Sequence, residues 1–333
     1  MDASQSIQTF AHLHWGHYPT PIETMPRLQA ALGTNAPTLF IKRDDYTGPG
    51  FGGNKVRKLE YFLAQAVADQ CEVVITIGGV RSNHCRVTAA FCAKLGLRCI
   101  LILNATELPA FKPASVFAEE LYGAEIHLVR SREERTSTMR RLAGELRQQG
   151  LKVCEVPLGA STALGALGYV AAANELKTQI ATEGLRFDYI FHSSSSGGTQ
   201  AGLVAGCYLS EISDVQIIGV SPDDSSESIG REVGNILAGV ADLLQVAPFR
   251  STIRLLDEYV GEGYGIDTPE SVVAIQLLAQ TEGIVLDPTY TAKAMAALLD
   301  WIRLGKITAS DNVLFWHTGG QLAHFNSHQG FSP

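Results

Sequence analysis

Cysteine is sparse and irregularly spaced in this chain of 333 residues, which carries six, at positions 71, 85, 92, 99, 154 and 207. No two of them form a C-x-x-C pair, so the spacing argues against a zinc site and against a disulfide framework. Cys85 and Cys92 lie seven residues apart on one predicted helix, and we expect them to pack in the core. No metal site is predicted.

The sequence also lacks the features of membrane, nucleic-acid-binding and exported proteins. No apolar run reaches the length of a bilayer span. Lysine and arginine total 26 against 34 aspartates and glutamates, a net charge of −8, which argues against a nucleic-acid surface. Residues 1–10 contain no lysine or arginine and no apolar core, so no signal peptide is predicted. Together these absences predict a soluble, cytoplasmic protein with neither nucleic-acid nor membrane partners.

Charged residues are few, at 18% of the chain, whereas 46% of the residues are apolar. This composition supports a large buried core and not disorder. Apolar runs such as residues 73–77 (VVITI) alternate with helical patterns, which predicts an α/β fold with mostly parallel sheets. A glycine-rich segment, residues 158–168, marks the expected connection between two domains. Helices are expected at 168–179 and over most of 223–256.

Glycine is concentrated between Gly48 and Gly53, directly before an amphipathic helical pattern. Asn54 is predicted to cap that helix, which places Lys55 in its first turn. The partial positive charge of a helix N-terminus favours the neutral amine of a lysine there. A neutral amine beside a loop that a ligand can approach closely is what Schiff-base chemistry requires.

Two other interpretations of this stretch exist. The residue types alone also fit a solvated basic patch formed by Lys55, Arg57 and Lys58. The glycines fit the dinucleotide-binding fingerprint letter by letter, but Pro49 breaks its tight turn, and five residues separate the glycines from the preceding strand at 38–42. The dinucleotide interpretation is therefore disfavoured.

A second loop, Ser193–Gly202, joins a predicted strand to a predicted helix and is rich in serine and glycine. Backbone N–H groups at a helix start, together with hydroxyls, form an anion site. The chain lacks the Gly-Lys-(Ser/Thr) sequence of a nucleoside-triphosphate loop here. A flexible turn with an ordinary helix cap is the alternative. Lys58, one helical turn from Lys55, is positioned to reach the same anion.

The run Gly52-Gly53-Asn54-Lys55-x-Arg57-Lys58-Leu59-Glu60 closely resembles the pyridoxal-phosphate lysine motif of the D-cysteine desulfhydrase and 1-aminocyclopropane-1-carboxylate deaminase family. The resemblance extends from Pro19–Ile22 to His317–Gly320. It implies a fold-type-II, tryptophan-synthase-β-like enzyme with pyridoxal 5'-phosphate in the cleft between two α/β domains. The larger domain would comprise residues 1–58 plus 168–333, and the smaller residues 59–167. We also expect a homodimer.

The resemblance implies a role for each matching residue. Lys55 would form the Schiff base, Ser82 would lie near the carboxylate and Cα of the substrate, and Asn83 would bond the pyridine 3'-oxygen. Thr318 would face the pyridine nitrogen, where a hydroxyl does not demand a protonated ring. The other positions carried over are Tyr264 and Tyr290 (active-site tyrosines), Asn54, Lys58, Ser195, Ser196, Gly197, Gly198 and Thr199 (cofactor), and His84 and Thr291 (substrate). Taken alone, Ser82 and Asn83 also fit ordinary helix caps, and a lone tyrosine is more often a packing residue.

The implied reaction is α,β-elimination from a small amino acid, with D-cysteine giving pyruvate, sulfide and ammonia and Lys55 removing the Cα proton. Thr291 stands where the cyclopropane deaminases carry glutamate, which disfavours that substrate. Arg81 replaces the glutamine of many relatives and leaves open an anionic substrate such as L-cysteate, although a surface position for Arg81 is favoured. A cofactor-binding protein without turnover is a further alternative, disfavoured by the presence of Lys55, Ser82 and both tyrosines.

Overall fold

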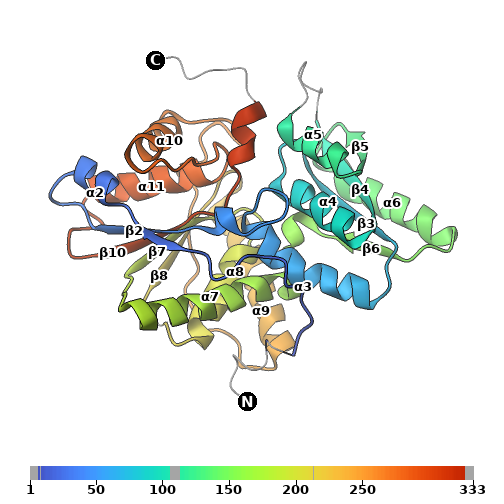
Figure 1. Ribbon diagram of the computed structural model, residues 1–333, viewed down its shortest axis with the longest axis horizontal. Coiled ribbons are helices and arrows are strands. Elements are labelled where there is room, and N and C mark those ends of the chain that lie inside the picture. Colours follow the sequence, from blue (N-terminus) through green and yellow to red (C-terminus); the bar gives the residue numbers. More distant parts are fainter. Residues whose placement is uncertain (1–6, 8, 106–112, 213, 327–333) are drawn as a thin grey trace.

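The computed structural model describes residues 7, 9–105, 113–212 and 214–326, so most of the segment used above to assess a signal peptide lies outside it. Two sheets lie side by side in Figure 1, one of six strands in the order β1-β2-β10-β7-β8-β9 and one of four in the order β5-β4-β3-β6. Strand β1 runs antiparallel to β2, and the other paired strands are parallel. The predicted α/β class with mostly parallel sheets is confirmed.

The larger sheet comprises β1 (Ile22–Thr24), β2 (Thr38–Lys42), β7 (Tyr189–Ser193), β8 (Gln216–Val220), β9 (Arg254–Leu256) and β10 (Asn312–Trp316). The smaller sheet comprises β3 (Val73–Gly79), β4 (Arg98–Asn104), β5 (Glu125–Val129) and β6 (Val153–Val156). The helices are α2 (Pro26–Leu32), α3 (Asn54–Ala68), α4 (Asn83–Leu95), α5 (Ala114–Leu121), α6 (Glu134–Gln148), α7 (Ala163–Glu183), α8 (Gly198–Leu209), α9 (Ser226–Leu244), α10 (Pro269–Glu282) and α11 (Thr291–Arg303). Short 3-10 turns cover Asp44–Tyr46, Leu158–Ala160 and Gln321–Asn326. No helix of the described residues is long and apolar enough to span a membrane.

Helices cover both faces of each sheet, which explains why the strands read as continuous apolar runs. In β3, Ile75 packs with residues of α6 such as Ala143, whereas Val74 packs with residues of α3 and α4. In the larger sheet, α2, α10 and α11 cover one face and α7 and α8 cover the other (Figure 1). Alternate side chains of one strand therefore enter different cores.

The segment 158–168 is only partly the connection that the sequence predicted, because α7 already begins at Ala163. Gly159 lies in the turn before α7 with φ of 67°, whereas Gly165 and Gly168 lie within the helix and do not interrupt it. A Cβ on Gly168 would lie 2.1 Å from the main-chain oxygen of Arg57 in α3, so only glycine allows the two helices to approach this closely. The expectation of helix over most of 223–256 was wrong for Arg254–Leu256, which forms β9 at the edge of the larger sheet.

The strands of the two sheets come from the two sets of residues that the sequence assigned to two domains. The proposed boundaries, at 58/59 and 167/168, fall inside α3 and α7. Helix α3 is therefore divided between the two proposed domains. The exact domain boundaries stay a prediction.

A buried network of charges holds α3 against the larger sheet. The Arg57 guanidinium donates to both Asp44 carboxylate oxygens at 2.8 Å and to Glu175 of α7 at 2.9 Å. Tyr169 of α7 donates to Asp44 at 2.6 Å. The side chains of Arg57 and Asp44 are 3% and 0% exposed, so each charge depends on its partners for compensation.

Removing one partner of this network should destabilise the fold. We expect Arg57→Met to lower the free energy of unfolding by about 3–5 kcal/mol, because Asp44 would keep a buried, uncompensated charge. Urea denaturation followed by fluorescence measures the change. The matched control is Arg98→Met, which breaks an ion pair with Glu125 whose side chains are both 44% exposed and should cost less than about 1 kcal/mol. Equal losses in the two variants would contradict this account of α3.

Candidate active site

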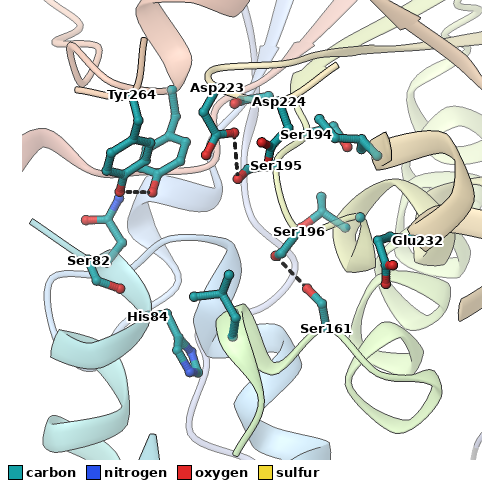
Figure 2. A pocket seen from close by; sticks show the side chains of 18 of the residues that line it. Ser82, His84, Ser161, Ser194, Ser195, Ser196, Asp223, Asp224, Glu232 and Tyr264 are labelled. Atoms are coloured by element: carbon teal, nitrogen blue, oxygen red, sulfur yellow. Dashed lines mark hydrogen bonds between the residues drawn. The ribbon is translucent and has the colours of Figure 1, made fainter. Parts of the chain in front are cut away.

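A cavity of about 380 Å³ opens where strands of both sheets reach their carboxyl ends. Strand ends in parallel sheets are a common location of ligand sites. Lining residues at or just after the ends of β3, β4, β7 and β10 are Gly79, Asn104, Ser193 and Thr318. The predicted site residues that line the cavity are Asn54, Lys55, Ser82, Asn83, His84, Ser195, Ser196, Gly197, Thr199, Tyr264, Tyr290 and Thr318. Figure 2 shows several of them around the open space.

Asn54 does not cap α3 as the sequence predicted. Gly53 occupies the N-cap position with φ of 105°, and a Cβ there would lie 2.8 Å from the main-chain oxygen of Thr318, so glycine is required. Asn54 is the first helical residue, and its backbone N–H donates to that Thr318 oxygen at 3.0 Å. Its side-chain amide donates to the Thr199 hydroxyl at 3.0 Å. Asn54 therefore ties the start of α3 to the end of β10 and the start of α8.

Lys55 follows in the first turn of α3, as predicted, and lines the cavity. Burial lowers the pKa of its amine to about 8. The sequence argument assigned this effect to the helix N-terminus, whereas the structure gives burial as the cause. Near neutral pH, Lys55 is therefore neutral to a greater extent than an ordinary lysine, although the protonated form still predominates.

Lys58 lies one turn further along α3 and is completely buried, which excludes the solvated basic patch. Its ammonium donates to the Ser161 hydroxyl at 2.6 Å, and that hydroxyl bonds Ser196 at 2.6 Å (Figure 2). A Cβ on Gly198 would lie 2.7 Å from Lys58 Nζ, so the loop backbone and the amine share one small space. Burial, and secondly the charge of Lys55, hold the pKa of Lys58 well below its usual range.

These residues fit the phosphate of a bound cofactor. Within the described part of the chain no ion pair engages the Lys58 amine, which faces the N-terminus of α8, where positive potential accumulates. A phosphate dianion would favour the protonated form of Lys58, offset the partial positive charge at the start of α8 and accept hydrogen bonds from the hydroxyls of the loop. Among the residues that the structure describes, the buried side-chain oxygens of Asn83, Ser193 and Ser194 have no hydrogen-bond partner, as expected of groups that serve a ligand.

Ser161 is a site residue that the sequence analysis missed. It lies in the glycine-rich segment that was interpreted as a domain connection, and no local motif sets it apart from other serines. Only the fold brings it to Ser196, 35 positions away, and to Lys58, 103 positions away.

Ser82 and His84 occupy the start of α4. The Ser82 hydroxyl accepts the backbone N–H of Cys85 at 3.2 Å, so Ser82 is a helix cap that also lines the cavity. The Thr76 hydroxyl donates to the Val156 oxygen at 2.8 Å and therefore accepts from His84 Nε2, also at 2.8 Å. His84 Nδ1 is left as a buried acceptor. Burial holds the pKa of His84 well below its usual range, so the imidazole is neutral.

Tyr264 and Tyr290 bring two phenols together in the cavity, with their oxygens 2.5 Å apart (Figure 2). Burial raises the pKa of Tyr264 to about 12 and also holds that of Tyr290 well above its usual range. Both phenols are therefore protonated at neutral pH, and one of them keeps a hydroxyl hydrogen for a ligand.

Thr291 does not line the cavity, contrary to the role carried over from the family. It is completely buried, and its hydroxyl donates to the Asp287 carboxylate at 2.7 Å. The same carboxylate accepts the backbone N–H of Tyr290 at 2.9 Å. Thr291 therefore completes the N-terminal turn of α11 and orients Tyr290 without facing the cavity.

Arg81 does not line the cavity either, and it is half-buried, so its favoured surface position stays a prediction. Two other arginines, Arg132 and Arg135, do line it. No local pattern singles out these two arginines, because residues 131–149 form a polar helical pattern with many charges. Asp223 and Asp224, which follow β8, line the cavity as well and were also missed.

Comparison with known proteins agrees with this geometry. The sequence profile of the family described as "Pyridoxal-phosphate dependent enzyme" matches residues 15–319. A D-cysteine desulfhydrase of Yersinia pestis is 36% identical over 332 residues, covering 98% of this chain and 99% of the relative. A D-cysteine desulfhydrase of Klebsiella pneumoniae is 37% identical over 336 residues, covering 97% and 98%.

Solved structures give the same result. A homologue of 1-aminocyclopropane-1-carboxylate (ACC) deaminase, 34% identical, superposes with a TM-score of 0.87 over 96% of this chain and 94% of the other. A fungal L-serine ammonia-lyase from Rhizomucor miehei shares the fold, with a TM-score of 0.67 at 19% identity over 93% and 97%. With a family match over most of its length, and a cavity that places a lysine of lowered pKa near the hydroxyls and the N-terminus of α8, the chain belongs to the pyridoxal-phosphate dependent enzymes.

Proposed function

We propose that this enzyme catalyses an α,β-elimination from D-cysteine. Together with water, D-cysteine is converted to pyruvate, ammonium and hydrogen sulfide. The observation that carries the proposal is the position of Lys55, a lysine of lowered pKa that lines one cavity with Ser82 and Ser196. The Ser196 hydroxyl is linked through Ser161 to the buried amine of Lys58. The nearly full-length similarity to D-cysteine desulfhydrases supports the choice of substrate.

The anion cradle of Lys58, Ser161, Ser196 and the N-terminus of α8 would hold the phosphate of pyridoxal 5'-phosphate, with Asn83 and Thr318 near its ring. When bound, the cofactor withdraws electrons from the substrate Cα and so acidifies the proton there. This electron withdrawal is the chemistry that no side chain of the cavity supplies.

The residues of this chain perform the remaining tasks. Lys55, as a neutral amine, accepts the Cα proton. The backbone N–H groups at the start of α4 and the Ser82 hydroxyl bind the substrate carboxylate. The pair of Tyr264 and Tyr290 donates a hydrogen bond to the sulfur as the Cβ–S bond breaks, with the bonding electrons leaving on sulfur. Protonation of the sulfur gives hydrogen sulfide, and water converts the three-carbon fragment to pyruvate and ammonium.

The proposal extends to a cytoplasmic homodimer with the two domains at the boundaries expected from the sequence. The family resemblance supports the dimer, and the separate origin of the two sheets supports the domain assignment. Light scattering on the purified protein measures its mass in solution, and cell fractionation tests its location.

Replacement of Lys55 should abolish turnover. We expect Lys55→Ala to lower kcat for keto-acid release from D-cysteine by at least about a hundredfold, because general-base catalysis contributes on the order of 10²–10⁴. A panel of D- and L-amino acids that includes ACC measures keto-acid formation. The control, Lys177→Ala, removes an exposed lysine on α7 and should leave the rate unchanged. Normal turnover by Lys55→Ala would assign the chemistry to another group.

The lowered pKa of Lys55 predicts how the cofactor-free protein captures pyridoxal phosphate. Only the neutral amine attacks the aldehyde, so the capture rate should rise with pH and level off above about 8, and not above the ordinary lysine value of 10.5. Stopped-flow absorbance gives the rate, and borohydride trapping followed by peptide mass analysis identifies the lysine. Label on any lysine other than Lys55, or a rate still rising at pH 10, would refute this assignment.

A further inference from the structure

Two of the six cysteines lie together at the edge of the smaller sheet, outside the cavity lining. Cys71 lies in the turn between α3 and β3, and Cys154 is the second residue of the edge strand β6. All six cysteines are free thiols. The elimination reaction proposed above uses neither Cys71 nor Cys154.

The strand register places the Cys154 side chain on the face of the sheet that α3 covers. Cys154 lies opposite Val74 of β3, and residues in register on neighbouring parallel strands point to the same face. Val74 packs in one core cluster with Leu59 of α3, and Cys154 borders that cluster. Cys71 borders the same cluster, and its backbone N–H donates to the Ala66 oxygen of α3 at 2.9 Å. Both cysteines therefore lie on one side of the sheet, at the end of α3.

The two thiols are in contact with each other. A side-chain hydrogen bond joins them, with the Cys154 thiol as the donor and the Cys71 sulfur as the acceptor. The backbone holds the two segments together, because the N–H groups of Glu72 and Val73 both donate to the Lys152 oxygen, at 2.8 and 3.2 Å. Two thiols in contact form a disulfide after a small displacement of the sulfur atoms, whereas distant thiols require movement of the backbone.

Both residues are also accessible to a dissolved reagent. Cys71 and Cys154 are half-buried, and the turn residues Asp69, Gln70 and Glu72 beside Cys71 are exposed. An exposed turn has few packing contacts that oppose a small shift of Cys71 towards β6. Burial and the Asp69 carboxylate raise the pKa of Cys71, so the thiolate, which is the form that attacks a disulfide, becomes abundant only above neutral pH.

A second pair of cysteines allows a comparison within the same chain. Cys92 of α4 and Cys99 of β4 also share a side-chain hydrogen bond, but they are 0% and 3% exposed. If contact between thiols were sufficient, an oxidant would link both pairs. Because a reagent in solution must also reach a sulfur atom, only the pair of Cys71 and Cys154 is expected to react.

We propose that Cys71 and Cys154 form a reversible disulfide on reaction with an oxidised low-molecular-weight disulfide. The Cys71 thiolate attacks one sulfur of the reagent and releases one thiol. Cys154 then attacks the mixed disulfide at Cys71 and releases the second thiol. The two cysteines lose two electrons and two protons, and the reagent gains them as it becomes two thiols. The bond joins the α3–β3 turn to β6 and stabilises the fold by restricting the unfolded chain.

The test treats the holoenzyme with glutathione disulfide at about pH 8.5 and maps its unreduced peptides by mass spectrometry. The expected result is the loss of two hydrogen atoms, with Cys71 and Cys154 in one cross-linked pair of peptides and with Cys92 and Cys99 unmodified. Dithiothreitol should reverse the change. The cross-linked protein should melt about 2–6 °C above the reduced protein, because a disulfide across a long loop lowers the entropy of the unfolded chain.

Single replacements identify the reacting thiols. In Cys71→Ser, and likewise in Cys154→Ser, the remaining cysteine of the pair should stop at a mixed disulfide with glutathione, and the rise in melting temperature should be lost. The matched control is Cys207→Ala, which removes a buried thiol of α8 and should leave the cross-link intact. Circular dichroism shows whether each variant is folded, and the peptide map of the unaltered protein decides the outcome without any variant.

Three results would overturn the inference. The first is a protein that stops at mixed disulfides or remains unmodified, since the two thiols would then be unable to join or to react. The second is a cross-link between Cys92 and Cys99 in place of the one between Cys71 and Cys154. The third is a melting temperature that stays constant or falls on cross-linking, which would show that the bond strains the fold. None of these results bears on the elimination reaction.

Discussion

The buried ion pairs of Arg57 determine where α3 lies, and the position of α3 determines the site. Asp44 precedes the glycine loop and Glu175 belongs to α7, so Arg57 joins three segments that are distant in sequence. Lys55 lies two residues before it, on the first turn of the same helix. Any shift of α3 would therefore move the amine relative to the strand ends that surround the cavity.

Arg57 and Lys58 are both buried basic side chains, but they differ in their hydrogen-bond and ion-pair partners. Arg57 is compensated by two carboxylates, which makes it part of the framework. Lys58 is equally buried, but among the described residues its amine bonds only the Ser161 hydroxyl, and its pKa is lowered. The cavity thus combines two lysines of lowered pKa with the N-terminus of α8, and a bound phosphate would stabilise the folded state by mass action as well as enable the chemistry.

The sequence alone determined those features whose physical cause is local. Alternating strand and helix patterns predicted the α/β class, since periodicity reflects the structure of a short segment. The glycines before Lys55 and the hydroxyl loop before Thr199 predicted an amine and an anion cradle, because backbone conformation and helix starts depend on a few adjacent residues. The resemblance to one enzyme family extended these local signals to Ser82, Tyr264 and Tyr290.

Only the tertiary structure decided which side chains the cavity contains and which charges are compensated. Ser161 and Arg135 line the cavity, although the sequence analysis did not single them out. Thr291 instead bonds Asp287, and the Asn54 side chain bonds Thr199 and does not cap α3. The pKa of Lys55 depends likewise on burial by segments far from it in sequence. Burial and partner choice arise from contacts between residues that can be more than a hundred positions apart, and no local pattern encodes them.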